Sequence, residues 1–322
     1  MRNRLYTAAL LLLALIMAVA GCSKKPPASD TNTGAGVIRV QAPLAPPSIP
    51  LVSMLGDSAV QVIWYSKADE AMSRIIEDSV DVSIIPVNSM SVLHNRGVNI
   101  QLGAVSTWGI LYLVSGDPQV KGWADLKGKT VAVGAMGYSP DLIFRGLLKK
   151  NGLSERDVKI IYGTSPEIAQ MIIAKKISLA VLPEPLLTSV LSRSKEYGIV
   201  MNLEEEWLKA YPEARGLPQA GLAVSARFAG DNPSAWREFY DKYNNSLLSY
   251  VNNPEKIGAA EEKALSLPAE VIRESLGRSN LKLQTAREAR EAVDGYLGQL
   301  LLIDPEAVGG TVPDRESSFY LK

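Results

Sequence analysis

The chain has 322 residues, 34 Lys and Arg against 34 Asp and Glu, one Cys and one His. At about 150 residues per domain, this length predicts two domains with hydrophobic cores of their own. A formal net charge of zero argues against a nucleic-acid-binding protein, which usually carries a basic excess. A single Cys allows no intrachain disulfide and no thiolate cluster, and a single His excludes an HExxH metal motif. The chain also lacks GxSxG, Walker, GxGxxG and EF-hand patterns. We therefore expect no enzyme, no catalytic residue, no metal site and no cofactor.

Residues 1–21 have the pattern of an export signal peptide. Arg2 and Arg4 precede an apolar run, residues 8–20, that is shorter than the roughly 20 residues a membrane-spanning helix needs. The run ends at Val19-Ala20-Gly21-Cys22, which resembles the lipobox of bacterial lipoproteins. This resemblance implies cleavage before Cys22 and a membrane lipid on its sulfur, with the protein anchored to the cell membrane and facing the outside or the periplasm. A noncleaved N-terminal anchor is the alternative.

Residues 22–36 contain Ser, Lys, Pro, Thr and Gly but no large aliphatic or aromatic residue. Such a composition cannot form a packed core, so it predicts a flexible tether between the lipid and the folded body. Export also makes nucleotide cofactors poor candidates.

From Val37 onward, strand-like and helix-like patterns alternate, which predicts an α/β protein. The expected strands are 37–42, 61–65, 81–85, 100–104, 130–133, 159–162 and 179–182. The expected helices are 50–55, 68–78, 87–95, 141–150 and 166–175.

Part of this pattern occurs twice in one gapless register. Residues 62–67 align with 159–164, and in the same register 81–86 align with 178–183. Each copy predicts a strand, a polar turn, an amphipathic helix and a short strand that ends in proline. Convergence of two similar βαβ units is the alternative, but the shared register favours two related lobes.

The β-prone stretches 105–114 and 220–224 predict the two connections between the lobes. Lobe 1 would comprise 37–112 and 220–322, and lobe 2 would comprise 113–219. In the tail, Asp231-Asn232-Pro233 predicts a helix start, and the aromatic residues that follow have the spacing of a packed helix face. We therefore expect the tail to cover lobe 1.

Three segments resemble a known family. The segment with Asp125-Leu126-Lys127-Gly128-Lys129 is similar to the start of the second lobe in bacterial solute-binding proteins. Residues 79–83 and Pro183-Glu184-Pro185 resemble segments of the nitrate/sulfonate/taurine and thiamine-precursor-binding proteins of ABC importers, although Ser79 replaces the usual glycine. The resemblance covers about 37–250.

This resemblance implies the type II periplasmic-binding-protein fold: two α/β lobes around an interdomain cleft, joined by a two-segment hinge. It further implies capture of a small-molecule ligand by lobe closure and delivery to an ABC permease and its ATPase. We expect a monomer without a nucleic-acid partner.

In parallel sheets, ligands bind beyond the carboxyl ends of the strands, and clefts between domains are favoured sites. The corresponding loops here are 43–48, 66–69, 86–89, 135–141, 163–167 and 183–186. Together with one residue between the lobes, they supply the candidate ligand-binding residues Pro43, Leu44, Ser66, Lys67, Asn88, Ser89, Trp108, Met136, Gly137, Tyr138, Ser139, Thr164, Ser165 and Glu184.

These candidates differ in chemistry. Ser139 and Ser165 each precede a proline, which predicts helix N-caps whose exposed N–H groups could hold an anion or a carbonyl oxygen. Lys67 is the clearest cation, and Glu184 could accept a ligand N–H or instead bridge the lobes. None of the loops contains Arg, which argues against a strongly anionic ligand, and the nearby aromatic residues favour a partly planar one. Nitrate, a sulfonate, a pyrimidine and other small organic molecules all remain open.

Two other functions remain as alternatives. Enzymes such as chorismate dehydratase share this fold, although they lack export signals. A sensor would present its closed form to a membrane receptor rather than to a transporter.

Overall fold

The computed structural model describes residues 36–134 and 136–322. The predicted signal peptide, the predicted lipidation site Cys22 and all of the predicted tether except Gly36 lie outside the described residues, as does Ala135.

The first sheet has six strands in the order β11-β4-β10-β3-β1-β2. Its strands are β1 (Ile38–Pro43), β2 (Val60–Tyr65), β3 (Val82–Pro86), β4 (Ile100–Thr107), β10 (Ala220–Ser225) and β11 (Leu281–Thr285). Strand β1 is parallel to β2 and β3, whereas β10 is antiparallel to β3 and β4. Apolar side chains such as Val40 and Ile84 are fully buried, as expected for a sheet covered on both faces.

The second sheet has five strands in the order β7-β6-β8-β5-β9. These strands are β5 (Leu111–Ser115), β6 (Thr130–Val133), β7 (Lys159–Tyr162), β8 (Leu179–Pro183) and β9 (Gly198–Asn202). Strand β6 is parallel to β7 and β8, and β5 is antiparallel to β8 and β9.

The two sheets repeat one arrangement, which confirms the internal repeat. In the first sheet β4-β10-β3-β1-β2 are neighbours in this order, and in the second sheet the order is β9-β5-β8-β6-β7. In both runs three strands are parallel, the fourth (β10 or β5) is antiparallel to them, and the fifth (β4 or β9) is antiparallel to the fourth.

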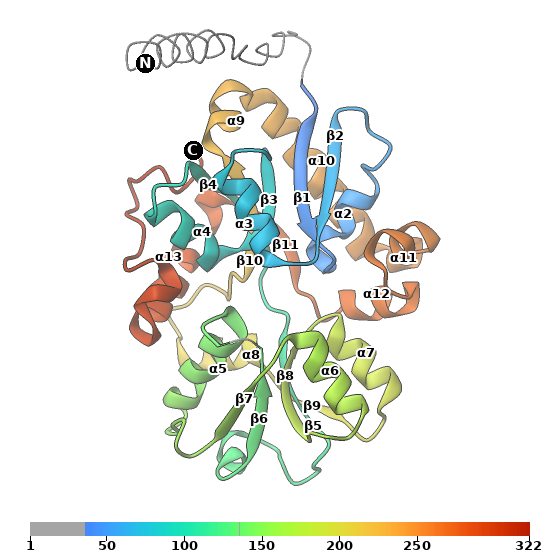
Figure 1. Cartoon of the computed structure of the whole chain (residues 1–322), viewed down its shortest axis with the longest axis vertical. Coiled ribbons are helices and arrows are strands. Elements are labelled where there is room, and N and C mark those ends of the chain that lie inside the picture. The colour runs from blue at the N-terminus through green and yellow to red at the C-terminus, as the bar shows by residue number, and fades with distance from the viewer. Residues whose placement is uncertain (1–35, 135) are drawn as a thin grey trace, which may run out of the picture. The chain divides into compact units, whose positions relative to one another are not determined.

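The helices divide between the two halves of the fold (Figure 1). Around the first sheet are α2 (Ile49–Val52), α3 (Ala68–Ile76), α4 (Val87–Asn95), α9 (Ala226–Asp231), α10 (Pro233–Asn252), α11 (Ala259–Leu265), α12 (Ala269–Leu276) and α13 (Ala286–Ile303). Around the second sheet are α5 (Ser139–Lys150), α6 (Ser165–Ile173), α7 (Leu186–Arg193) and α8 (Leu203–Ala210). Short 3-10 turns lie at Pro46–Ser48, Trp123–Leu126, Pro254–Lys256 and Pro305–Val308.

The connections between the sheets differ from the sequence prediction: the first is shorter than 105–114, and the second lies before the predicted residues 220–224. Between β4 and β5 the chain passes from one sheet to the other at residues 108–110. Residues 220–224, expected as the second connection, instead form β10 inside the first sheet, and the passage precedes them at 211–219. The reason is packing, because Leu222 and Val224 are fully buried between β3 and β4. The helix expected at 50–55 is also shorter and preceded by a 3-10 turn.

The C-terminal tail packs as expected and does more. Trp236, Phe239 and Tyr243 of α10 are buried against the first sheet, so the aromatic stripe is a packing surface. Helix α13, in contrast, contacts α5 as well as β4 and β11. Tyr296 of α13 shares one apolar cluster with Phe144 of α5. The tail therefore also covers part of the second half.

Among the described residues, no helix combines the length and the apolar character that crossing a bilayer requires.

Candidate functional site

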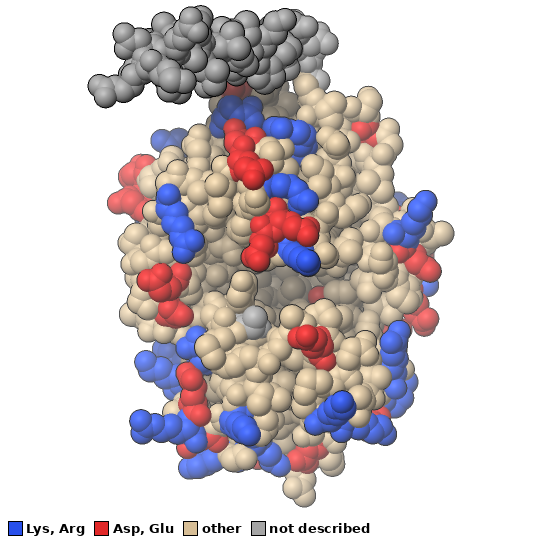
Figure 2. All heavy atoms as spheres, in the orientation of Figure 1, with Lys and Arg blue, Asp and Glu red and all other residues tan. Residues whose placement is uncertain are grey.

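The carboxyl ends of the parallel strands in the two sheets point toward each other. In Figure 1, β1 runs toward the second sheet and β6 runs toward the first, and their parallel neighbours follow them. Figure 2 shows that the surface between these strand ends is hollowed. The expected ligand loops follow these strands directly, so we take this interlobe hollow as the candidate site.

The loop after β1 is largely apolar, and two hydrogen bonds restrain it. Ser48 donates a hydrogen bond from its hydroxyl to the Pro43 carbonyl oxygen at 2.5 Å, and Tyr243 donates to the Pro47 carbonyl oxygen. Pro43 is half-buried, whereas Leu44 is exposed. Because proline fixes φ and both bonds restrain the turn, Leu44 is presented on a stiff loop.

Ser66 and Lys67 lie between β2 and α3, where both are exposed. The Lys67 backbone is extended at the N-cap of α3, and its side chain makes no ion pair with any described residue. The acidic Asp69 and Glu70 follow in the first turn of α3, where the helix dipole stabilises carboxylates. The N-terminus of α3 therefore carries one ammonium group and two carboxylates.

Asp141 organises the loop after β6. Its fully buried carboxylate accepts hydrogen bonds from the Gly137 N–H at 2.8 Å and from the Tyr162 hydroxyl at 2.9 Å. Arg145 binds it with Nε and Nη2, both at 2.9 Å. Gly137 has φ +79°, a conformation that favours glycine. The turn leaves Met136 66% and Tyr138 53% exposed, so two large apolar side chains project from it.

The N-caps differ from the sequence prediction. Tyr138 and Thr164 occupy the N-cap positions of α5 and α6, and Ser139 and Ser165 are the first helical residues. Thr164 forms a capping box: its hydroxyl accepts from the Glu167 N–H at 3.4 Å, and the Glu167 carboxylate accepts from the Thr164 N–H at 2.8 Å. The Thr-x-x-Glu spacing is the sequence signal that favours Thr164. The Ser139 hydroxyl oxygen instead lies 3.2 Å from the hydroxyl oxygen of Tyr296 in α13.

Two further candidates make contacts inside the protein. The buried Asn88 donates from its amide to the Ala307 carbonyl oxygen at 3.1 Å, and Ser89 beside it is half-buried. Trp108 is buried, and its indole N–H donates to the Lys282 carbonyl oxygen at 2.8 Å. A Cβ added at Gly216 would lie 2.6 Å from this indole ring, so the ring is packed against the second connection. A ligand contact by any of these side chains stays a prediction.

Glu184 is engaged by an arginine that the sequence reasoning missed. Arg278, between α12 and β11, donates from Nε to Oε1 of Glu184, whose side chain is fully buried. The bond joins the end of β8 to the C-terminal tail, which is the lobe-bridging alternative left open for Glu184. Burial raises the pKa of the Glu184 carboxyl, while the bonds from Arg278 and Thr188 act in the opposite direction. No local motif marks Arg278, because the contact spans 94 residues of sequence.

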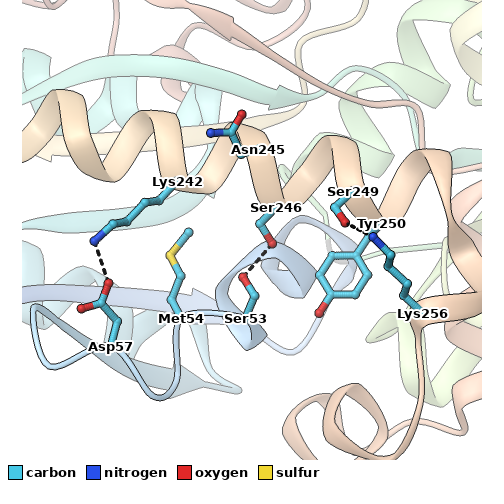
Figure 3. Close-up of a pocket in the computed structure, with 9 residues that line it drawn as sticks. All are labelled: Ser53, Met54, Asp57, Lys242, Asn245, Ser246, Ser249, Tyr250 and Lys256. Atoms are coloured by element: carbon cyan, nitrogen blue, oxygen red, sulfur yellow. Dashed lines mark hydrogen bonds and ion pairs between the residues drawn. The ribbon is translucent and has the colours of Figure 1, made fainter.

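A separate groove lies on the first half, between α10 and the turn after α2 (Figure 3). It encloses about 540 Å³ and is lined by Ser53, Met54, Asp57, Lys242, Asn245, Ser246, Ser249, Tyr250 and Lys256. Most of its polar groups bind one another: Lys242 pairs with Asp57 at 2.7 Å, and Lys256 donates to Ser249 at 2.8 Å. None of the expected ligand loops contributes to this groove, so we assign it no ligand.

The sequence matches a family model described as NMT1/THI5 like over residues 57–257. This segment is more than half of the chain and includes strands of both sheets. The chain belongs to the NMT1/THI5-like family. No curated protein matches it.

Solved structures resemble this NMT1/THI5-like protein over most of its length. An ABC transporter from Parabacteroides distasonis has 26% identity and a TM-score of 0.76, covering 89% of this chain and 99% of its own. The periplasmic aliphatic sulphonate binding protein SsuA from Escherichia coli has 14% identity and a TM-score of 0.67, covering 88% and 99%. The alkanesulfonate-binding protein SsuA from Xanthomonas axonopodis pv. citri, bound to MOPS, has 17% identity and a TM-score of 0.62, covering 84% and 97%.

At this level of identity, the two sulfonate-binding proteins share the fold with this chain. The NMT1/THI5-like protein therefore has the periplasmic-binding-protein fold that the sequence predicted, with two α/β halves on either side of the hollow. In the described part of the chain, no three His, Cys, Asp or Glu side chains gather as they would to hold a metal ion.

Proposed function

We propose that this protein is a solute-binding protein that captures a small molecule between its two halves and delivers it to an ABC import permease. The observation that carries the proposal is the opposition of the parallel strand ends of two sheets across one hollow. Family membership and the similarity to ABC-transporter proteins support it. Ligand contacts from both halves would stabilise the closed form, because the open form cannot make them together.

The exposed side chains around the hollow suit a small organic molecule or anion. Leu44 on one side and Met136 and Tyr138 on the other offer apolar or aromatic surface. Lys67 and the Gly137 region add an ammonium group and a turn of backbone beside a helix start. A ligand with a compact apolar or planar body and one polar or anionic end would use both kinds of group.

The predicted export signal supports a location outside the cytoplasm, in keeping with the periplasmic neighbours. We further propose cleavage before Cys22, lipid attachment to its sulfur and a tether over 22–36. The lobes would comprise 37–112 with 220–322, and 113–219. The working form would be a monomer, with the permease, its ATPase and the membrane lipid as partners.

These neighbours are transporter and binding proteins, which supports a binding function over catalysis. We accordingly propose that the protein is not an enzyme and that its ligand leaves the hollow unchanged.

Native mass spectrometry of the full chain, purified without refolding, tests the proposal directly. We expect a small-molecule adduct of one ligand per chain that is lost on unfolding. The same compound should then raise the melting temperature of the protein. Other compounds of its size from a panel of nitrate, alkanesulfonates and pyrimidines should leave the melting temperature unchanged. Absence of both an adduct and any thermal shift across this panel would contradict the proposal, as would turnover of the bound compound.

A further inference from the structure

The short segment between α12 and β11 connects two elements of the first half, but it forms hydrogen bonds with the second half. The Arg278 carbonyl oxygen accepts a hydrogen bond from the Tyr112 hydroxyl of β5 at 2.8 Å. The Asn280 amide donates to both carboxylate oxygens of Glu204 in α8, at 2.8 and 2.7 Å. Backbone and side chains of this segment therefore both reach across to the second sheet.

The Arg278 guanidinium makes the most buried of these contacts. Its Nε donates to Glu184 and its Nη2 donates to the Thr188 hydroxyl, each at 2.5 Å. Thr188 in turn donates from its hydroxyl and its backbone N–H to Glu184, at 3.0 and 3.1 Å. These bonds close a three-residue network around a carboxylate that has no exposed surface. Charge-assisted bonds with such fixed directions hold one relative placement of their partners.

This segment, the start of β11 and the end of β8 also bond to the connection between the sheets at residues 108–110. The Trp108 backbone N–H donates to the Asn280 carbonyl oxygen at 3.1 Å, and the Trp108 indole donates to the Lys282 carbonyl oxygen at 2.8 Å. The Glu184 N–H donates to the Ile110 carbonyl oxygen at 2.9 Å. Any rotation of one half about this connection must carry these bonds with it or break them.

We propose that the segment 278–282 is a latch across the connection between the halves, and that Arg278 and Glu184 are its positioning pair. The latch holds the halves at one angle, so that the loops of both face the same volume. Neither side chain needs to touch the ligand, because they act through the placement of β8 and the tail. The role of the latch in ligand capture rests on the proposed function, whereas its effect on the angle between the halves does not.

Spin labels on the full chain measure that angle without a ligand. On a Cys22→Ser background, Asp241→Cys in α10 and Lys176→Cys after α6 place one nitroxide on an exposed position of each half. Double electron–electron resonance then gives the distribution of distances between the two nitroxides. We expect a narrow distribution in the parent chain, a broader and shifted one in Arg278→Ala, and partial recovery in Arg278→Lys.

The double variant Glu184→Gln with Arg278→Met controls for misfolding, because it removes the positioning pair without leaving a buried unpaired charge. It should broaden the distribution as Arg278→Ala does. Arg273→Ala is the matched control, since this arginine of α12 donates to the Ile257 carbonyl oxygen within the first half. It should lower the melting temperature and leave the distances unchanged.

Unchanged distances in both Arg278→Ala and the double variant would overturn the latch, whatever their melting temperatures. Because this test uses ligand-free protein, its failure differs from that of the proposed function, which would appear as absent ligand binding with the latch intact.

Discussion

The carboxylate of Asp141 accepts a hydrogen bond from the backbone N–H of Gly137 at 2.8 Å. A buried acid in the first turn of α5 thereby holds the turn from which the exposed Met136 and Tyr138 project. The arrangement needs no ligand to form, because Arg145 and Tyr162 supply the other partners of the carboxylate. A loop that is already ordered loses less conformational entropy when a ligand binds, which favours binding.

Asp141→Ala should destabilise the protein by about 3 kcal/mol, because it leaves the mostly buried Arg145 guanidinium with only the exposed Glu155, 3.7 Å away, as an acidic partner. Asp141→Asn should cost less and still speed hydrogen exchange at Gly137. Urea unfolding and amide exchange measure the two effects. The control is Asp125→Asn, whose carboxylate caps an exposed turn and should cost less than about 1 kcal/mol. Equal losses at the two positions would contradict this role of Asp141.

Lys67→Ala should weaken ligand binding by roughly 10- to 100-fold, the range for losing one charge-assisted hydrogen bond. The melting temperature should not change, since Lys67 is exposed. Calorimetric titration with the compound found by native mass spectrometry measures the loss. Lys176→Ala, an exposed lysine outside the loops, is the matched control. An equal affinity for both variants would remove Lys67 from the site.

The two repeated β-α-β units were predicted well from the sequence, because the patterns that indicate them are local. Alternating apolar strands and the gapless match of 62–86 with 159–183 correspond to β2-α3-β3 and β7-α6-β8. Loops at the strand ends followed from that pattern: Leu44 comes directly after β1, and Met136 and Tyr138 lie between β6 and α5.

Contacts made over long sequence separations could not be predicted in this way. Arg278 and Glu184 carry no motif that pairs them, and Asn88 gives no sign that its amide binds the Ala307 carbonyl oxygen. The position of Trp108 near a strand end indicated a stacking residue, whereas its burial depends on Gly216 in the second connection. The partners of Glu184 and Asn88 lie in the C-terminal tail, which has only a generic helical pattern, and Gly216 lies in a connection without a motif.

The latch also predicts an alkaline pH dependence through Tyr112, whose hydroxyl donates to the Arg278 carbonyl oxygen. Burial, followed by the nearby Glu184 charge, raises the pKa of Tyr112 to about 12. A raised pKa stabilises the fold fully below the unfolded value of about 10 and loses this contribution as the pH rises toward 12.

Urea unfolding at pH 8 and pH 11 should therefore show a larger loss of stability for the parent chain than for Tyr112→Phe, which cannot ionise there. The comparison cancels the titration of other groups. Parallel losses in the two proteins would contradict the role given to the Tyr112 hydroxyl.

Cys22→Ala should abolish lipid attachment. Mass spectrometry of the membrane-extracted protein should show a chain that begins at Cys22 and carries a diacylglycerol, whereas the variant should keep residues 1–21. Ser23→Ala is the control and should be processed normally. A parent chain that retains its first 21 residues would contradict the proposed anchor.

Hydrogen exchange with and without the compound that raises the melting temperature is the most direct test of capture between the halves. Our account predicts protection in loops from both sides at once: 43–48 and 66–69 in the first half, and 136–141 and 163–167 in the second. Protection confined to one half, or to the groove between α10 and α2, would contradict it.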